Sequence, residues 1–115
     1  MSIFASVIKN MSMGKKIYLY YGTEENCFET EKHEIKRNEI RATIKQWLAD
    51  DYCQVDEQEM AANEVEREFN ENGYGMWECE QGQGYNIIIG VAEQGKCRNV
   101  LNEIRNARRE AIAMF

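Results

Sequence analysis

The pattern of apolar and polar positions predicts three strands. Residues 17–21 are apolar and β-favouring throughout, which is typical of a strand inside a sheet. Apolar and acidic residues alternate near the end of residues 74–81, with the period of a half-exposed strand. Three consecutive isoleucines within residues 85–92 put apolar side chains on both faces of a central strand. Gly82 and Gly84 predict a hairpin turn between the last two strands.

A helical period appears in three other segments. From Asn38 onward the apolar residues fall on one stripe that reaches Leu48, which predicts an amphipathic helix. A second helix is expected from Asp56 to Asn72, and a third over residues 96–114. Residues 1–14 and 24–35 lack a clear period, so helix, strand and loop all stay open for them.

The second helix has the clearest predicted ends. Asp56 and Glu59 have the spacing of a capping box, and Val55 and Met60 occupy the positions of a hydrophobic staple. Gly73 stands where a left-handed residue closes a helix. We therefore expect Asp56 to be the N-cap and Val55 to pack against Met60.

The order of these elements predicts an α+β fold. We expect one two-layer domain over residues 1–115, with a three- or four-stranded, mainly antiparallel sheet and about three helices on one face. A chain of 115 residues suffices for one hydrophobic core but not for two.

Cysteine and histidine usage argues against a metal site. Cys27, Cys53, Cys79 and Cys97 are widely spaced and form no C-x-x-C pair, and His33 is the only histidine. We expect reduced thiols, a solvent-exposed His33, no metal and no cofactor. The longest apolar run is too short to span a bilayer, and the first residues lack the order of a secretory signal. A cytoplasmic protein without membrane contact is therefore expected.

Charge is distributed unevenly along the chain. The net charge is −6, but residues 50–80 hold eleven acidic residues and one basic residue, a net −10. Residues 1–49 and 81–115 each carry a net +2. An electropositive footprint for nucleic acid is missing, so no direct nucleic-acid binding is expected.

The acidic segment is the first candidate binding surface. Its helix carries a row of glutamates along one side, and two more glutamates follow on the adjoining strand. Such a surface has the electrostatic complementarity needed to dock on a basic partner protein, although a solvated face that keeps the protein soluble is the simpler interpretation. The predicted partner-binding residues are Glu57, Glu64, Glu68, Glu71, Glu78 and Glu80.

Two basic rows leave their pairing open. They can contact phosphates, pair with the acidic helix within one chain, or pair with it across a homodimer, which the opposite signs favour. The rows are Arg37, Arg41 and Lys45 on the first helix and Arg98, Arg105 and Arg109 on the last.

The turn before the last helix is the second candidate site. Gly90, Gly95 and Lys96 have the G-x-x-x-x-G-K spacing of a phosphate-binding loop, but Cys97 stands where a magnesium-binding Ser or Thr belongs. The simpler interpretation is an ordinary connection from strand to helix. The alternative is a non-hydrolytic site for a nucleotide or cyclic nucleotide, in which Arg98 takes part.

The sequence thus favours a non-catalytic protein over an enzyme, because it offers no pair of nucleophile and base. We expect an inhibitor or regulator that occupies a partner protein. In character it resembles the small acidic proteins with which phages and mobile elements block nucleic-acid-handling or defence machinery. Binding of a phosphate-bearing small ligand is the alternative.

Overall fold

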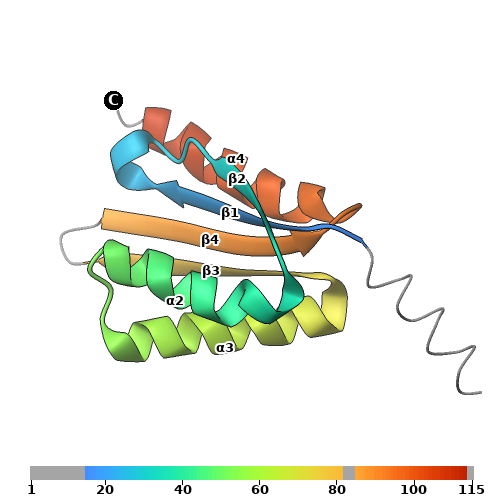
Figure 1. The fold of residues 1–115 in the computed structure, drawn as a ribbon. Coiled ribbons are helices and arrows are strands. Elements are labelled where there is room, and N and C mark those ends of the chain that lie inside the picture. Colours follow the sequence, from blue (N-terminus) through green and yellow to red (C-terminus); the bar gives the residue numbers. More distant parts are fainter. Residues whose placement is uncertain (1–14, 82–84, 114–115) are drawn as a thin grey trace, which may run out of the picture.

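A four-stranded antiparallel sheet lies at the centre of the computed structural model, with the strand order β2-β1-β4-β3 (Figure 1). The structure describes residues 15–81 and 85–113, and at residues 79–81 and 85 only the backbone. The predicted antiparallel sheet is confirmed. Its strands are β1 (Ile17–Thr23), β2 (Glu31–Ile35), β3 (Tyr74–Gln81) and β4 (Tyr85–Glu93).

The three predicted helices are present. They are α2 (Ile40–Asp50), α3 (Val55–Asn72) and α4 (Cys97–Ala113), and two 3-10 turns are η1 (Glu24–Asn26) and η2 (Arg37–Glu39). The undecided residues 24–35 contain η1 and β2. Residues 1–14, also undecided, lie outside the described part of the chain.

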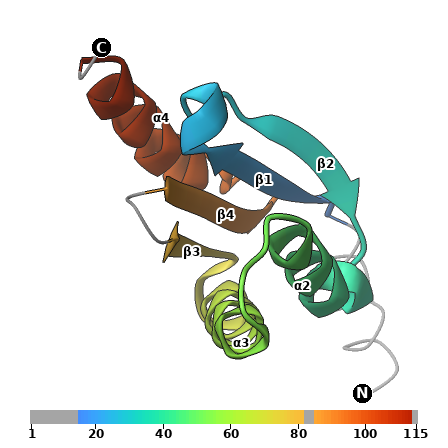
Figure 2. The ribbon, with the colours of Figure 1, turned by 90° about the vertical axis from the view of Figure 1, so that its left-hand side faces the viewer.

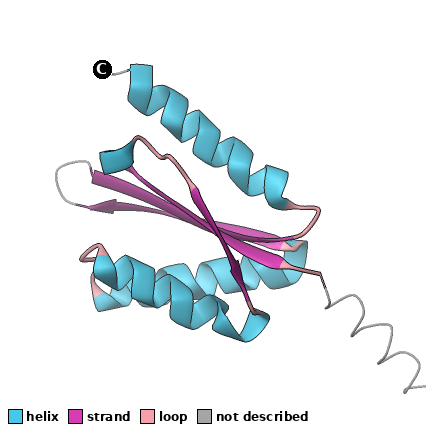
Figure 3. Cartoon of the chain, turned by 45° about the horizontal axis from the view of Figure 1, so that its top comes forward, coloured by secondary structure: helices cyan, strands magenta, loops and turns pink. Residues whose placement is uncertain are grey.

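The helices cover both faces of the sheet, which corrects the expectation that they share one face. Figures 2 and 3 show α2 and α3 on one side and α4 on the other. Ile87 and Ile89 of β4 join the core with α2 and α3, whereas Ile88 joins the core with α4. A central strand that is apolar on both sides needs cover on both sides. The α+β class stands, but with a helical layer on each face of the sheet.

Each face has its own buried core. Phe69 and Leu48 belong to the core between the sheet and the helices α2 and α3, and both are almost fully buried. Val100 and Ile104 of α4 pack against Tyr20 of β1 on the other face. Burial, followed by a hydrogen bond with the Cys97 thiol, raises the pKa of the Tyr20 phenol far above its ordinary value.

The start of α3 differs from the prediction. Its N-cap is Gln54, in an extended conformation and without a side-chain capping bond, so Asp56 lies inside the first turn. Val55 and Met60 are 73% and 54% exposed, and the expected staple between them is wrong. The predicted end is confirmed, because Gly73 has φ 83° and donates its N–H to the Phe69 carbonyl at 2.8 Å.

α3 lies unusually close to β3. A Cβ atom on Gly75 would stand 2.4 Å from the carbonyl oxygen of Val65, so only glycine allows this approach. The acidic helix is therefore held directly against the outer strand of the sheet.

Candidate functional site

One side of α3 is neutralised by α2. Arg41 reaches Glu59 at 2.8 Å and Glu66 at 3.8 Å, and Lys45 also forms an ion pair with Glu59. The hydrogen bond from Lys45 is the main reason why the pKa of Glu59 falls below its ordinary value. The basic row of α2 thus pairs with acids inside the molecule. Arg37, the third residue of that predicted row, lies in η2 and donates a hydrogen bond to the Asn70 side chain at 3.0 Å.

The other side of α3 carries the predicted row of Glu57, Glu64, Glu68 and Glu71, which we call the α3 acidic row. Its nearby cation is Arg67 of the same helix, which pairs with Glu64, with Glu71 at 3.1 Å and with Glu68 at 4.0 Å. The hydrogen bond from Arg67 lowers the pKa of Glu64, so this carboxylate stays ionised at neutral pH. Three carboxylates, those of Glu64, Glu68 and Glu71, share this one guanidinium and together keep a net negative charge.

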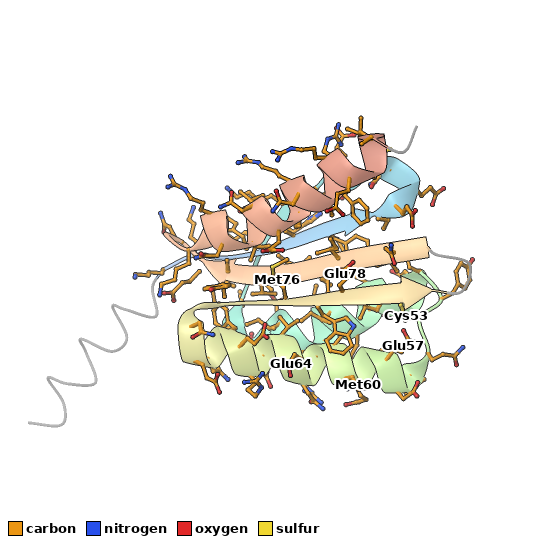
Figure 4. All side chains as sticks on the ribbon, turned by 180° about the vertical axis from the view of Figure 1, so that it is seen from behind. Cys53, Glu57, Met60, Glu64, Met76 and Glu78 are labelled. Atoms are coloured by element: carbon orange, nitrogen blue, oxygen red, sulfur yellow. The ribbon has the colours of Figure 1, made fainter. Side chains whose placement is uncertain are left out.

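The α3 acidic row borders the outer edge of β3. The Met76 N–H of β3 donates to the Glu68 carboxylate at 3.0 Å. Figure 4 shows Glu57 and Glu64 on α3, with Met76 and Glu78 on the neighbouring strand. The row therefore runs beside a sheet edge and not across an isolated helix surface.

Backbone groups of β3 point outward at this edge. Glu93 donates its N–H to the Gly73 carbonyl at 2.9 Å, which fixes the alternation of the ladder between β3 and β4. Odd-numbered residues of β3 then bond to β4, and the N–H and C=O groups of Met76 and Glu78 face away from the sheet. The Met76 N–H is already bonded to the Glu68 carboxylate. The Glu78 N–H and C=O groups pair with no other strand in the described part of the chain.

Glu78 lies on the other side of this edge from the α3 acidic row. Its Cα partner on β4 is Ile88, which belongs to the core with α4. The structure therefore brings the α3 glutamates together and places Glu78 on the opposite face of the sheet. The side chain of Glu80, the last predicted member, lies outside the described residues.

A groove lies beside Glu78, between β3 and α4. It has a volume of about 460 Å³, and its apolar lining includes Met76, Ile88 and Ala107. Carboxylates of Glu78, Glu103 and Glu110 line it, and Asn106 lies among them. Within the described part of the chain no cation forms an ion pair with these three glutamates.

The sequence prediction missed Glu103 and Glu110. They stand on one side of α4 at positions i and i+7, with Asn106 and Ala107 between them on the same side. The sequence shows this spacing, but it does not show that Glu103 and Glu110 face the groove. That depends on which side of α4 packs beside β3.

The arginines of α4 face elsewhere. Arg105 and Arg108 line a hollow beside Phe28 and Glu29, near the start of β2, and Arg108 donates to the Cys27 carbonyl at 3.3 Å. Among the described residues no arginine of α4 pairs with an acid of α3, because the sheet separates the two helices (Figure 2). Acidic side chains of both α3 and α4 thus lie beside β3, those of α4 being Glu103 and Glu110.

A second acidic cavity, of about 280 Å³, lies at the end of α2 beside Tyr21 and Trp47. Its carboxylates already accept hydrogen bonds: Asp51 from the Tyr21 hydroxyl and Asp50 from Gln46 at 2.9 Å. Burial raises the pKa of Asp51. This cavity is internally satisfied, unlike the groove beside β3.

The predicted phosphate loop is shorter than its spacing suggested. Gly90 lies inside β4, where a Cβ atom would stand 2.6 Å from Val100 Cγ1, so this glycine serves the packing of α4. Gly95 has φ 97° in the turn, and Lys96 donates to the Asn72 carbonyl at 3.0 Å. Arg98 is exposed beside this turn. Binding of a phosphate ligand here stays a prediction that none of these contacts favours.

Other chemistry expected or excluded from sequence can be placed as well. His33 packs edge-on against Trp47 at 4.6 Å between ring centroids and bonds to Glu31 at 3.1 Å, so it is not simply solvated. In residues 15–81 and 85–113, no three His, Cys, Asp or Glu side chains converge on a point that could hold a metal ion. None of the described helices has the length and apolar character that a bilayer crossing requires.

Comparison with known proteins finds no matching family model, no matching curated protein and no matching solved structure. The geometry at the β3 edge is therefore the basis on which a function is proposed.

Proposed function

We propose that this protein is a non-catalytic binding protein whose acidic surface occupies a basic surface of a partner protein. The contact residues are the α3 acidic row and Glu78. One observation carries the proposal: Glu64, Glu68 and Glu71 share a single guanidinium, that of Arg67, and the sheet keeps the arginines of α4 away from the acidic helix, so this side of α3 keeps a net negative charge. The row spans 15 residues of helix, about 21 Å from its first to its last member, which is enough to meet several basic side chains.

The biological role that fits this character is inhibition or regulation. A small protein that covers a basic, nucleic-acid-binding surface competes with the phosphates that the surface normally contacts. In its acidic character the protein resembles phage and mobile-element proteins directed against nucleic-acid-handling or defence machinery, and we propose a role of that kind for it.

The test is capture of basic proteins by the immobilised chain. Glu57, Glu64, Glu68 and Glu71 are changed together to Gln, which keeps size and hydrogen bonding, including an oxygen for the Met76 N–H. A matched control changes Glu29, Glu31, Glu34 and Glu39 to Gln. These glutamates belong to β2 and its flanking turns, at the opposite edge of the sheet from β3. Both variants lose four negative charges.

Capture that is lost in the first variant and kept in the control supports the proposal. The binding constant of each captured protein should also fall steeply with added salt, because exposed charges are screened within about 10 Å at 0.1 M ionic strength. Equal capture by both variants would contradict the proposed surface. Equal loss in both would mean that net charge alone, and not this surface, attracts the partner.

A further inference from the structure

In residues 15–81 and 85–113, no strand pairs with the outer edge of β3. Two groups there, the N–H and C=O of Glu78, face away from β4, and β3 is the last strand of the sheet on this side. Outer strands with exposed backbone groups are templates for pairing with another extended segment. Glu68 covers the Met76 N–H, so the open stretch begins beyond that bond.

We propose that the partner docks an extended basic segment on β3, adding a fifth strand to the sheet and laying a long cationic side chain in the groove between β3 and α4. This inference rests on the proposed function and specifies its partner. Main-chain hydrogen bonds supply the docking, and the acidic surroundings select a basic sequence.

The groove fits the side chain of arginine or lysine. Met76, Ile88 and Ala107 give the groove apolar lining against which an aliphatic stem packs. Glu78, Glu103 and Glu110 line the same groove, and their carboxylates lack an ion-pair partner in the described part of the chain. A guanidinium or ammonium group placed among them gains charge-assisted hydrogen bonds.

Side chains on the other face of the added strand meet α3. Successive residues of a strand point to opposite faces, so alternate positions of the docked segment face the groove and the α3 acidic row. Glu64 and Glu71 of that row share Arg67 as their cation. A basic residue on this face completes the neutralisation that α2 provides on the far side of α3.

A second copy of this chain is a poorer occupant. Two β3 edges that pair antiparallel with a twofold axis at Glu78 bring Glu78 of one copy close to Glu78 of the other. Like charges on paired edge strands are destabilising, and charged residues on edges commonly prevent such self-pairing. Charge complementarity therefore selects a basic segment from another protein.

The probe is a synthetic peptide of alternating arginine and threonine, as long as β3 (8 residues). Two variants are compared, both with a substitution at Glu78. Glu78→Pro removes the outward N–H at an edge position where proline is tolerated, and Glu78→Gln removes only the charge. We expect the Kd of the peptide to rise about tenfold or more in the Pro variant, because a hydrogen bond is lost and the ring hinders pairing. In the Gln variant a rise of about twofold to fivefold is expected.

A direct measurement supports the comparison if the Pro variant folds poorly. Amide hydrogen exchange of the wild-type chain, followed by NMR, should show the Glu78 N–H exchanging rapidly alone and becoming protected on peptide addition. The variant Glu103→Gln/Glu110→Gln should bind the peptide with a higher Kd, but at saturating peptide the Glu78 N–H should be as protected as in the wild type. Peptide binding without protection of the Glu78 N–H, or absence of binding, overturns the inference.

The outcomes separate this inference from the proposed function. A partner that is lost in the four-glutamine variant of α3 but kept by a folded Glu78→Pro variant would leave the proposed function standing and would refute strand addition. A dimer in solution whose Glu78 N–H is protected without peptide would assign the edge to a second copy and would also refute the basic segment. Loss in both variants supports both proposals.

Discussion

The two faces of the sheet are covered to different extents. Two helices, α2 and α3, cover one face, whereas α4 alone covers the other (Figure 3). The outer strands of a four-stranded sheet are about 14 Å apart, and one helix is about 10 Å wide. A single helix therefore leaves part of its face exposed, and in this protein the exposed part is the groove beside β3. The better-covered face holds the larger core, and the less-covered face holds the candidate site.

The largest expected loss of stability comes from a substitution in the core between the sheet and the helices α2 and α3. Phe69→Ala should lower the free energy of unfolding by about 3–5 kcal/mol, because it opens a cavity in the core that α3 and the sheet share. Urea unfolding followed by tryptophan fluorescence measures this. Ile112→Ala, at a position 51% exposed on α4, is the control and should change stability by less than about 0.5 kcal/mol. Similar losses in both variants would mean that the core is not where the structure places it.

Substitution of two glycines, one facing α3 and one facing α4, tests how each face of the sheet is packed. Gly75→Ala should cost about 1–3 kcal/mol, because its methyl group meets a backbone oxygen of α3 that no side-chain change can move. Gly90→Ala meets Val100 Cγ1 instead, so the added change Val100→Ala should recover part of its loss. Urea midpoints of the single and double variants measure the coupling. Strictly additive effects of Gly90→Ala and Val100→Ala would show that α4 does not pack as described.

The internally paired side of α3 should respond to pH. The pKa of Glu59 is lowered from 4.5 in the folded state, so its ion pairs contribute stability above pH 4.5 and lose it as the pH falls through the lowered value. The melting temperature of wild type should exceed that of Glu59→Gln at pH 7, and the gap should close below pH 4.5. A gap that stays constant on acidification would contradict the pairing with Lys45 and Arg41.

The smallest effect is expected at the groove. Glu103→Gln/Glu110→Gln should change the free energy of unfolding by less than about 0.5 kcal/mol, because neither carboxylate has an ion-pair partner in residues 15–81 and 85–113. Urea unfolding against wild type measures this. A loss above about 1 kcal/mol would assign these glutamates a structural role and would remove them from the proposed site.

Sequence reasoning succeeded where a local pattern determines the structure. The isoleucines of β4 identified a central strand, and Gly73 identified the end of α3. It did not identify β2, whose polar residues form a strand because they pair with β1. It placed α4 on the wrong face of the sheet, although Ile88 already required cover there. The cap of α3 was missed because Gln54, without a side-chain capping bond, begins the helix earlier than Asp56.

The candidate site was predicted only in part, for a similar reason. The α3 acidic row follows from helical spacing within one segment, so the sequence was sufficient to find it. The groove joins Glu78 to Glu103 and Glu110 of a distant segment, and only the packing of α4 beside β3 brings them together. The pairing of Arg41 and Lys45 with Glu59 likewise depends on the antiparallel contact of α2 with α3.

The α3 acidic row and Arg105 and Arg108 of α4 lie on opposite faces of the sheet, which separates charge across the molecule and gives it an electric dipole with the negative end at α3. In the field of a positively charged partner such a molecule is turned toward a productive orientation before contact. Salt should then slow association much more than it speeds dissociation, because steering acts over distances at which the charges are screened.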